Sequence, residues 1–278
     1  MGKVFGARLI KSVPFSSVAP SVQNTPSKGL RVIGAGAGRT GTSSLQAALK
    51  IMGYKPYHMA DCFVGDHAEL WKHAVETGNV EKVVDMLLQE GYDAIVDEPG
   101  SYFVPQLAEH FPEAKIVLTH RANIAGWIQS VKKLALLHNQ FASWPFSSLP
   151  FIQRFGSMAK DILSRRGCSV ENLLRDDADG TCSDWYMKHY KETKLLFDDG
   201  RLLEYDVSEG WPPLLAHLES TNATSMISPA MPFPRTNSGD EVLFIVSLMK
   251  AIPILCAVFV GMMVHAILGL AFRFQTIG

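Results

Sequence analysis

Residues 32–44, VIGAGAGRTGTSS, carry the glycines and hydroxyls of a phosphate-binding turn. Gly36, Gly38 and Gly41 fit the G-x-G-x-x-G spacing of a dinucleotide-binding turn. The segment from Gly36 to Ser43 also fits the G-x-x-x-x-G-K-[S/T] spacing of a compact phosphate loop, with Thr42 in place of the lysine. Both kinds of turn bind phosphate through backbone N–H groups at the start of a helix. They differ in the ligand that they bind.

The residues around the glycines favour the compact phosphate loop. A dinucleotide fold requires a carboxylate at the end of its second strand, about 20 residues beyond the glycines. Asp61 has that separation, but YKPYHMA before it contains no β-branched run that would form the strand. The stretch TGTSS instead places hydroxyls at a helix start, and the Arg39 guanidinium can bind phosphate oxygens in a bidentate fork. Because the lysine is absent, Mg²⁺-dependent hydrolysis of ATP or GTP is disfavoured.

Strand and helix patterns alternate along the chain. Residues 30–36 are typical of a buried strand that enters the glycine turn, and TSSLQAALKIMG is typical of the helix after it. Further strands are predicted at 93–96, at 114–121 and within GRLLEYDV, and helical patterns lie between them. Strands that alternate with helices indicate a parallel sheet with helices on both faces. We therefore predict an α/β fold in which the candidate residues follow the ends of strands.

The motifs also occur in the order seen in a known family. VIGAGAGRTGTSSLQAAL, GYKPYHM, AIVDEPG, AKIVLTHR followed by GWIQSV, LLEYDV with GWPPLL, and FPRTNS resemble P-loop sulfotransferase-like proteins over residues 30–238. The branch they most resemble is common in fungal genomes, and some of its members are labelled as dinucleotide enzymes. The resemblance implies a P-loop NTPase-like sheet. It also implies binding of 3'-phosphoadenosine 5'-phosphosulfate (PAPS) and transfer of its sulfuryl group to a hydroxyl or amine.

The resemblance assigns the 5'-phosphosulfate site to the glycine turn. Arg39 stands where many family members have lysine, and it would neutralise charge on the bridging oxygen as the S–O bond breaks. The hydroxyls of Thr42 and Ser43 would bind the 5'-phosphate. The implied site residues are Gly38, Arg39, Thr40, Gly41, Thr42, Ser43 and Ser44.

The second family element is an arginine after a strand and a serine on the next helix, which hold the 3'-phosphate. Arg121 and Ser130 match this element, although they are nine residues apart where eight is more usual. HRANIAGW also lacks the frequent Arg-Asp-Pro turn, which leaves Ser130 less secure than Arg121. Arg235 in FPRTNS is either a third contact or a linker arginine.

Three residues are candidates for the base that takes the acceptor proton. Asp97 follows AIV at a strand end, where related enzymes place their base, and is the first candidate; Glu98 is the second and His58 the third. Asp97 is otherwise a cap of the turn before Pro99, and His58 a hydrogen-bonded core histidine. The aromatic residues of the next loop region either line an apolar acceptor pocket or pack the loop onto the core. These are Phe141, Trp144, Phe146, Phe151 and Phe155.

Composition narrows the class of protein. The chain has 278 residues, 47% of them hydrophobic, which is enough for one α/β domain with an appendage. A net charge of −1 argues against a general nucleic-acid binder. The four cysteines are scattered without a C-x-x-C pair, so we expect reduced thiols and neither a zinc site nor a disulfide scaffold. The histidines show no metal-ligand spacing, and no metal is expected.

The strongest compositional signal is the charge-free run AIPILCAVFVGMMVHAILGLAF at 251–272. At about 1.5 Å per residue it matches a hydrocarbon core of roughly 30 Å, so we predict one membrane-spanning helix there with Pro253 in its first turn. The predicted segments are a basic arm (1–28), a sulfotransferase-like domain (29–219), a linker (220–250) and this helix. Because the run lies near the chain end and no secretory signal precedes the domain, we expect the domain to face the cytosol.

Three functions follow, in order of preference. The first is a membrane-anchored, PAPS-dependent sulfotransferase of a small apolar alcohol or phenol. The second is a P-loop nucleotide-binding adaptor without transferase chemistry, and the third is a dinucleotide oxidoreductase.

Overall fold

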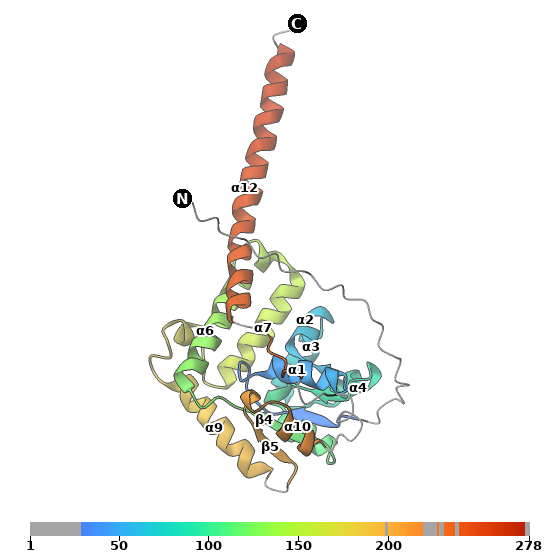
Figure 1. Ribbon diagram of the computed structural model, residues 1–278. Helices are drawn as coiled ribbons and strands as arrows, with labels where there is room; N and C mark the ends of the chain where they lie inside the picture. The colour runs from blue at the N-terminus through green and yellow to red at the C-terminus, as the bar shows by residue number, and fades with distance from the viewer. Residues whose placement is uncertain (1–28, 198–199, 219–226, 228–230, 237–238, 276–278) are drawn as a thin grey trace, which may run out of the picture.

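The computed structural model of the protein describes residues 29–197, 200–218, 227, 231–236 and 239–275. Within them, five parallel strands form a sheet in the order β2-β3-β1-β4-β5 (Figure 1). The strands are β1 (Val32–Gly34), β2 (Pro56–Tyr57), β3 (Ala94–Ile95), β4 (Lys115–Thr119) and β5 (Leu202–Tyr205). The prediction of a parallel α/β sheet flanked by helices is confirmed. The two-residue edge strand β2 was not predicted, since Pro56–Tyr57 carries no β-branched pattern.

The strand order has a switch point at β1. The chain leaves β1 for β2 and β3 on one side and then crosses to β4 and β5 on the other. In open α/β sheets a switch point opens a crevice at the carboxyl ends of the strands. The glycine turn follows β1 directly, so the fold places it in that crevice.

Helices cover both faces of the sheet because strand side chains alternate in direction. Val32 belongs to a buried cluster with Leu45 and Leu214 from the helices of one face, while Ile33 belongs to the opposite cluster with Leu87. The helices are α1 (Thr42–Ile51), α2 (Met59–Val64), α3 (Ala68–Thr77), α4 (Glu81–Gln89), α5 (Val104–His110), α6 (Ile124–Phe141), α7 (Pro150–Arg165), α8 (Val170–Leu174), α9 (Thr181–Leu196), α10 (Trp211–His217) and α12 (Gly239–Gln275).

A third buried cluster joins α6, α8 and α9 beside the sheet. Cys168 and Cys182 belong to it and form a disulfide. The expectation of unpaired cysteines is therefore wrong for this pair. Because α8 and α9 both pack against α6, two cysteines 14 residues apart meet without any local motif. Cys62 and Cys256 are free thiols, the first buried and the second exposed.

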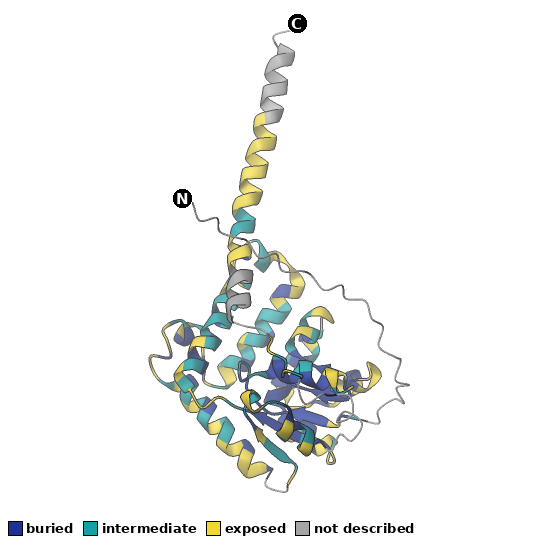
Figure 2. Ribbon diagram, viewed as in Figure 1, coloured by how far each residue is buried: buried dark blue, intermediate teal, exposed yellow. Residues whose placement is uncertain are grey.

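The C-terminal helix α12 leaves the domain beside α6, against which it packs (Figures 1 and 2). Its segment Ser247–His265 is long and apolar enough to cross a membrane and is almost entirely exposed. The helix begins at Gly239, inside the segment assigned to the linker, so Pro253 lies within the helix instead of in its first turn. The predicted arm at 1–28 lies outside the described residues.

Candidate active site

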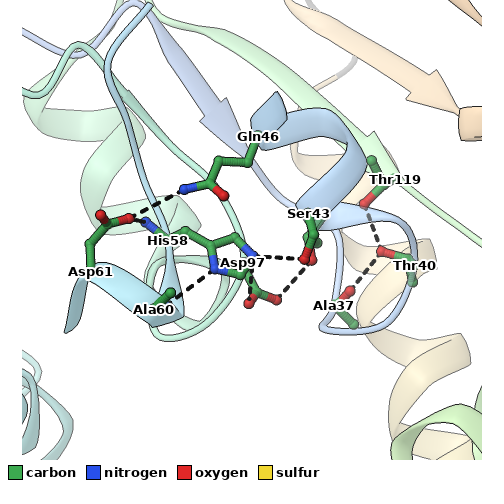
Figure 3. A network of polar contacts seen from close by, with 10 residues as sticks. Ala37, Thr40, Ser43, Gln46, His58, Ala60, Asp61, Asp97 and Thr119 are labelled. Atoms are coloured by element: carbon green, nitrogen blue, oxygen red, sulfur yellow. Dashed lines mark hydrogen bonds and ion pairs between the residues drawn. The ribbon is translucent and has the colours of Figure 1, made fainter. Parts of the chain in front are cut away.

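The glycine turn between β1 and α1 is shaped by close backbone contacts. A Cβ at Gly36 would lie 1.9 Å from Thr119 Oγ1, so only glycine lets the turn pack on the end of β4. Gly41 has a φ of 101°, and a Cβ there would lie 2.6 Å from the Val207 side chain. Thr40 Oγ1 donates to Ala37 O at 2.6 Å and pairs with Thr119 Oγ1 at 2.6 Å (Figure 3). The Thr40 hydroxyl therefore stabilises the turn itself.

Helix α1 presents its positive end at this turn. Its first N–H groups have no partner within the helix, no side chain caps them, and the first turn contains no acidic residue. Arg39, just before the helix, has a φ of 69°, a conformation that is uncommon outside glycine and concentrates at functional sites. The turn thus combines a helix N-terminus with a guanidinium, which is an arrangement suited to an anion.

A polar cavity of about 530 Å³ lies over the helix end. It is lined by residues 39–44, 120–121, Ser130, 206–208 and 234–236. The predicted phosphate contacts Arg39, Arg121 and Arg235 therefore all reach one cavity, although they lie far apart in sequence. Gly38 is the one predicted loop residue that does not line it.

Arg121 and Ser130 are positioned by α6 and α9. The Tyr186 hydroxyl accepts from Arg121 N at 2.8 Å and lies 3.3 Å from Arg121 O, which fixes the backbone while the arginine side chain stays exposed. Ser130 Oγ accepts from Arg39 Nε at 3.0 Å. Ser130 therefore contacts both the cavity and the loop arginine.

Two aromatic side chains, from α6 and α9, contact the backbone of the turn. Trp127 Nε1 donates to Gly38 O at 3.0 Å, and His189 Nε2 lies 2.7 Å from Ala35 O. Burial lowers the pKa of His189, which keeps its ring neutral near pH 7. Neither residue was predicted to act at the site, since nothing in the sequence pattern links them to the turn.

The base candidates Asp97 and His58 belong to one buried network (Figure 3). Asp97 Oδ1 accepts from Thr42 Oγ1 at 3.0 Å, and His58 Nε2 lies 3.2 Å from both Asp97 Oδ2 and Ser43 Oγ. His58 Nδ1 accepts from Ala60 N at 3.3 Å, which favours a ring proton on Nε2, between Asp97 Oδ2 and Ser43 Oγ.

Asp97 has an unusual backbone conformation and a buried carboxylate. It has a φ of 67° and is almost fully buried. Burial raises its pKa, and the nearby charge of Glu98 adds to that rise, while His58 and the hydrogen bond from Thr42 oppose it. A Cβ at Gly38 would lie 3.4 Å from Asp97 Oδ1, so the carboxylate stands directly behind the turn. A carboxylate with a raised pKa is better matched to proton transfer than an exposed one.

Glu98 is in a different environment. Its carboxylate forms a two-bond ion pair with Arg166, with Oε2 accepting from Nη2 at 2.9 Å and Oε1 paired with Nη1. The Arg166 guanidinium lies 4.3 Å from the centroid of the Trp185 ring. These contacts give Glu98 a structural partner, so it is less suited than Asp97 to accept a proton. Arg166 lies in no recognisable motif and was not predicted.

A second cavity of about 210 Å³ lies between α6 and α7, and its walls are almost wholly apolar. Phe141 and Phe155 line it, as do Gly38, Arg39 and Glu98. Trp144, Phe146 and Phe151 from the same aromatic stretch do not. Arg39 is thus shared by the polar cavity and the apolar pocket.

Asp61 does not occupy a ribose-binding position. It lies in the first turn of α2, where its Oδ2 accepts from His58 N at 2.8 Å and from Gln46 Nε2 at 3.3 Å. The first contact caps α2, and the second joins α2 to α1. Among the described residues, no group of three or more His, Cys, Asp and Glu side chains is arranged to hold a metal ion.

The fold and the site define a parallel α/β protein in which a glycine turn suited to an anion follows the central strand. Comparison with known proteins adds the family. A family model described as "Sulfotransferase domain" matches residues 31–242. The "Ava biosynthesis cluster protein M" of Aspergillus versicolor is 32% identical over 201 residues, which cover 68% of this chain and 76% of that protein. The chain therefore belongs to the sulfotransferase domain family, as its motifs predicted.

Proposed function

We propose that the protein is a PAPS-dependent sulfotransferase that acts on the hydroxyl of a small apolar molecule and is anchored to a membrane by α12. The observation that carries the proposal is the place of Arg39, which lines both the polar cavity and the apolar pocket. Group transfer requires the donor and the acceptor to lie next to each other. The cavity and the pocket adjoin at Arg39.

The polar cavity is suited to the nucleotide of PAPS. The open N-terminus of α1 and Arg39 would bind the 5'-phosphosulfate, since both favour compact negative charge. Arg121 and Arg235, which line the same cavity, would bind the 3'-phosphate. Asp206, a carboxylate in the same lining, is suited to a sugar hydroxyl or an amino group instead of a phosphate.

Asp97 would accept the proton in the transfer step. The acceptor O–H gives its proton to the carboxylate while the acceptor oxygen forms its bond to sulfur. The S–O bond to the 5'-phosphate breaks, and its electron pair passes to the phosphate oxygen of the departing 3',5'-ADP, whose charge Arg39 neutralises. Asp97 is buried and lines neither cavity, but Gly38, which lines the apolar pocket, has no side chain between that pocket and the carboxylate. In this proposal the acceptor hydroxyl approaches Asp97 across Gly38.

The apolar pocket sets the class of acceptor. Its lining offers few polar groups, and two of them, Glu98 and Arg166, are paired with each other. Burial lowers the pKa of His138, another lining residue, so this ring is neutral near pH 7. An uncharged alcohol or phenol is therefore favoured over an anionic acceptor.

The membrane anchor and the side of the membrane are two separate parts of the proposal. The exposed apolar stretch Ser247–His265 supports the anchor. We place the domain on the cytosolic side, where PAPS is made. The Cys168–Cys182 disulfide is the feature that favours the opposite side, because disulfides are rare in the cytosol. Protease added to intact microsomes decides between them: cleavage of the domain supports the cytosolic side, and protection refutes it.

A thermal-shift series with full-length protein separates the three candidate functions. We expect 3',5'-ADP to give the largest stabilisation, well above that of ATP, GTP or NADH. Stabilisation by NADH alone would support an oxidoreductase instead. An adaptor would be stabilised by 3',5'-ADP and yet transfer no ³⁵S from labelled PAPS to apolar alcohols or phenols. Resistance to carbonate extraction from microsomes tests the anchor independently.

A further inference from the structure

The connection between α6 and α7 carries an exposed apolar surface that the site does not use. We define the hairpin tip as residues 142–153, ASWPFSSLPFIQ. In it the Trp144 side chain is 71% exposed, Leu149 41% and Phe151 39%. Outside α12, the other described large apolar residues that are exposed are single residues or an adjacent pair on other elements. They are Ile51, Val64, Leu88, Leu195 and Leu196.

The hairpin tip also lacks charge. No Asp, Glu, Lys or Arg occurs between Lys133 and Arg154. An uncharged surface loses little hydration energy when it leaves water, whereas each buried charge would oppose the transfer. The composition of this connection therefore permits contact with a lipid surface.

The base of the hairpin tip is braced by aromatic packing. The Phe63 ring of α2 lies 5.6 Å from Phe151, 5.0 Å from Phe155 and 6.0 Å from Phe141, measured between ring centroids. These contacts hold the start of α7 and the end of α6 together. Trp144 and Leu149 are therefore presented on a supported surface.

The hairpin tip lies on the side of the domain from which α12 departs. Helix α12 packs along α6, and Met249 is its last buried residue among those described. Ala251 to Pro253 are half-buried, and residues 254–265 are exposed. Figures 1 and 2 show the exposed part of α12 leaving beside the joined ends of α6 and α7. The charge-free run of α12 begins directly after Lys250, where the helix leaves the domain.

We propose that the hairpin tip is a second membrane contact, in which Trp144, Leu149 and Phe151 enter the interfacial layer of the bilayer that α12 spans. The proposal rests on the anchoring part of the proposed function. Tryptophan is enriched at the membrane–water interface because its ring is apolar and its N–H is polar. Two contacts, one spanning and one interfacial, fix the orientation of the domain. Phe141 and Phe155, which line the apolar pocket, contact Phe63 at the base of the hairpin tip, so the pocket lies next to the proposed membrane contact.

Fluorescence quenching in vesicles tests this contact with the full chain. The protein has five tryptophans, and none lies in α12. Trp71, Trp127 and Trp211 are buried and Trp185 is partly buried. The difference between wild type and Trp144→Phe therefore isolates Trp144. In phosphatidylcholine vesicles whose lipids are brominated near the top of the acyl chains, we expect the Trp144 component to lose most of its intensity.

A matched control places a tryptophan at another exposed apolar position. Leu195 is 81% exposed at the end of α9. In the Trp144→Phe background, Leu195→Trp should be unaffected by the brominated lipid. Vesicle flotation, measured on the same samples, reports the α12 anchor separately. If the protein floats but Trp144 is quenched no more than Trp introduced at 195, the interfacial contact is refuted while the anchor stands. A blue-shifted Trp144 emission without quenching places the hairpin tip against protein and also refutes the proposal.

Discussion

The polar cavity and the apolar pocket lie on two sides of Arg39 and are built in different ways. The cavity is formed largely by strand ends and the turns that follow them, in the crevice of the switch point. The pocket is formed by the faces of helices α6, α7 and α9 packed beside the sheet. The first arrangement places charge by backbone geometry, and the second excludes water by packing. A transferase with one charged donor and one neutral acceptor requires both.

The largest effect is expected for Arg39, because this residue belongs to both regions. Arg39→Ala should lower kcat/KM by about 10²–10³-fold, since it removes a group that neutralises developing charge. Arg39→Lys should retain part of the activity, because it keeps the charge but loses the hydrogen bond to Ser130. Arg201→Ala, at the opposite end of β5, is the matched control and should be neutral in steady-state assays. If Arg39→Ala were as active as Arg201→Ala, the proposed role of Arg39 in both regions would be refuted.

Asp97→Asn should affect the reaction without affecting the donor site. We expect kcat to fall by about 10²-fold or more while 3',5'-ADP affinity is unchanged. Because the base acts when ionised and burial raises the pKa of Asp97, the wild-type acid limb of kcat/KM should lie above the ordinary aspartate range. This limb should vanish in Asp97→Asn.

Asp61→Asn is the matched control for Asp97→Asn. It changes a nearby carboxylate whose contacts only cap α2 and bind Gln46. It should lower the thermal midpoint slightly and leave kcat and its pH profile intact. Undiminished turnover in Asp97→Asn would transfer the base role to His58 or Glu98.

Arg121→Ala tests the assignment of the 3'-phosphate within the polar cavity. Because a charge-assisted contact contributes roughly 1.5–3 kcal/mol, 3',5'-ADP should bind about 10- to 100-fold more weakly. 5'-AMP, which lacks the 3'-phosphate, should bind as before, as titration calorimetry can measure. Equal losses for both nucleotides would refute the assignment of the 3'-phosphate to Arg121.

The smallest effect is expected in the apolar pocket. Leu134→Ala removes apolar surface from the wall of the pocket, so KM for an apolar acceptor should rise by about 10-fold with little change in kcat. Affinity for 3',5'-ADP should not change. Leu195→Ala, on an exposed surface, should alter neither quantity. A loss of nucleotide affinity in Leu134→Ala would contradict the claim that the pocket binds the acceptor and the polar cavity binds the nucleotide.

More of the residues that line the polar cavity than of those that line the apolar pocket could be predicted from the sequence, and the reason is physical. Residues that follow parallel strands must meet at one edge of the sheet, so Arg121 could be placed near the turn from its position after a strand. The pairing of Glu98 with Arg166 and the disulfide between Cys168 and Cys182 depend on how helices pack against one another. No local pattern records that packing.

Secondary-structure boundaries were missed where local signals are weak. Pro56–Tyr57 becomes a strand only because it pairs with β3 at the edge of the sheet. Helix α12 starts at Gly239, before the charge-free run, and it includes a further apolar stretch, VLFIVSLM at 242–249, that Lys250 separates from that run. The aromatic residues at 141–155 do not share one role. Phe141 and Phe155 line the pocket, while Trp144 lies on the hairpin tip.

The central claim is that the polar cavity binds the donor nucleotide and leaves the apolar pocket to the acceptor. The most direct test is an experimental structure of the protein with bound 3',5'-ADP. The account predicts the 5'-phosphate at the N-terminus of α1 beside Arg39, the 3'-phosphate beside Arg121, and no nucleotide atom in the pocket between α6 and α7. A nucleotide whose adenine fills that pocket, or whose phosphates lie away from α1, would contradict it.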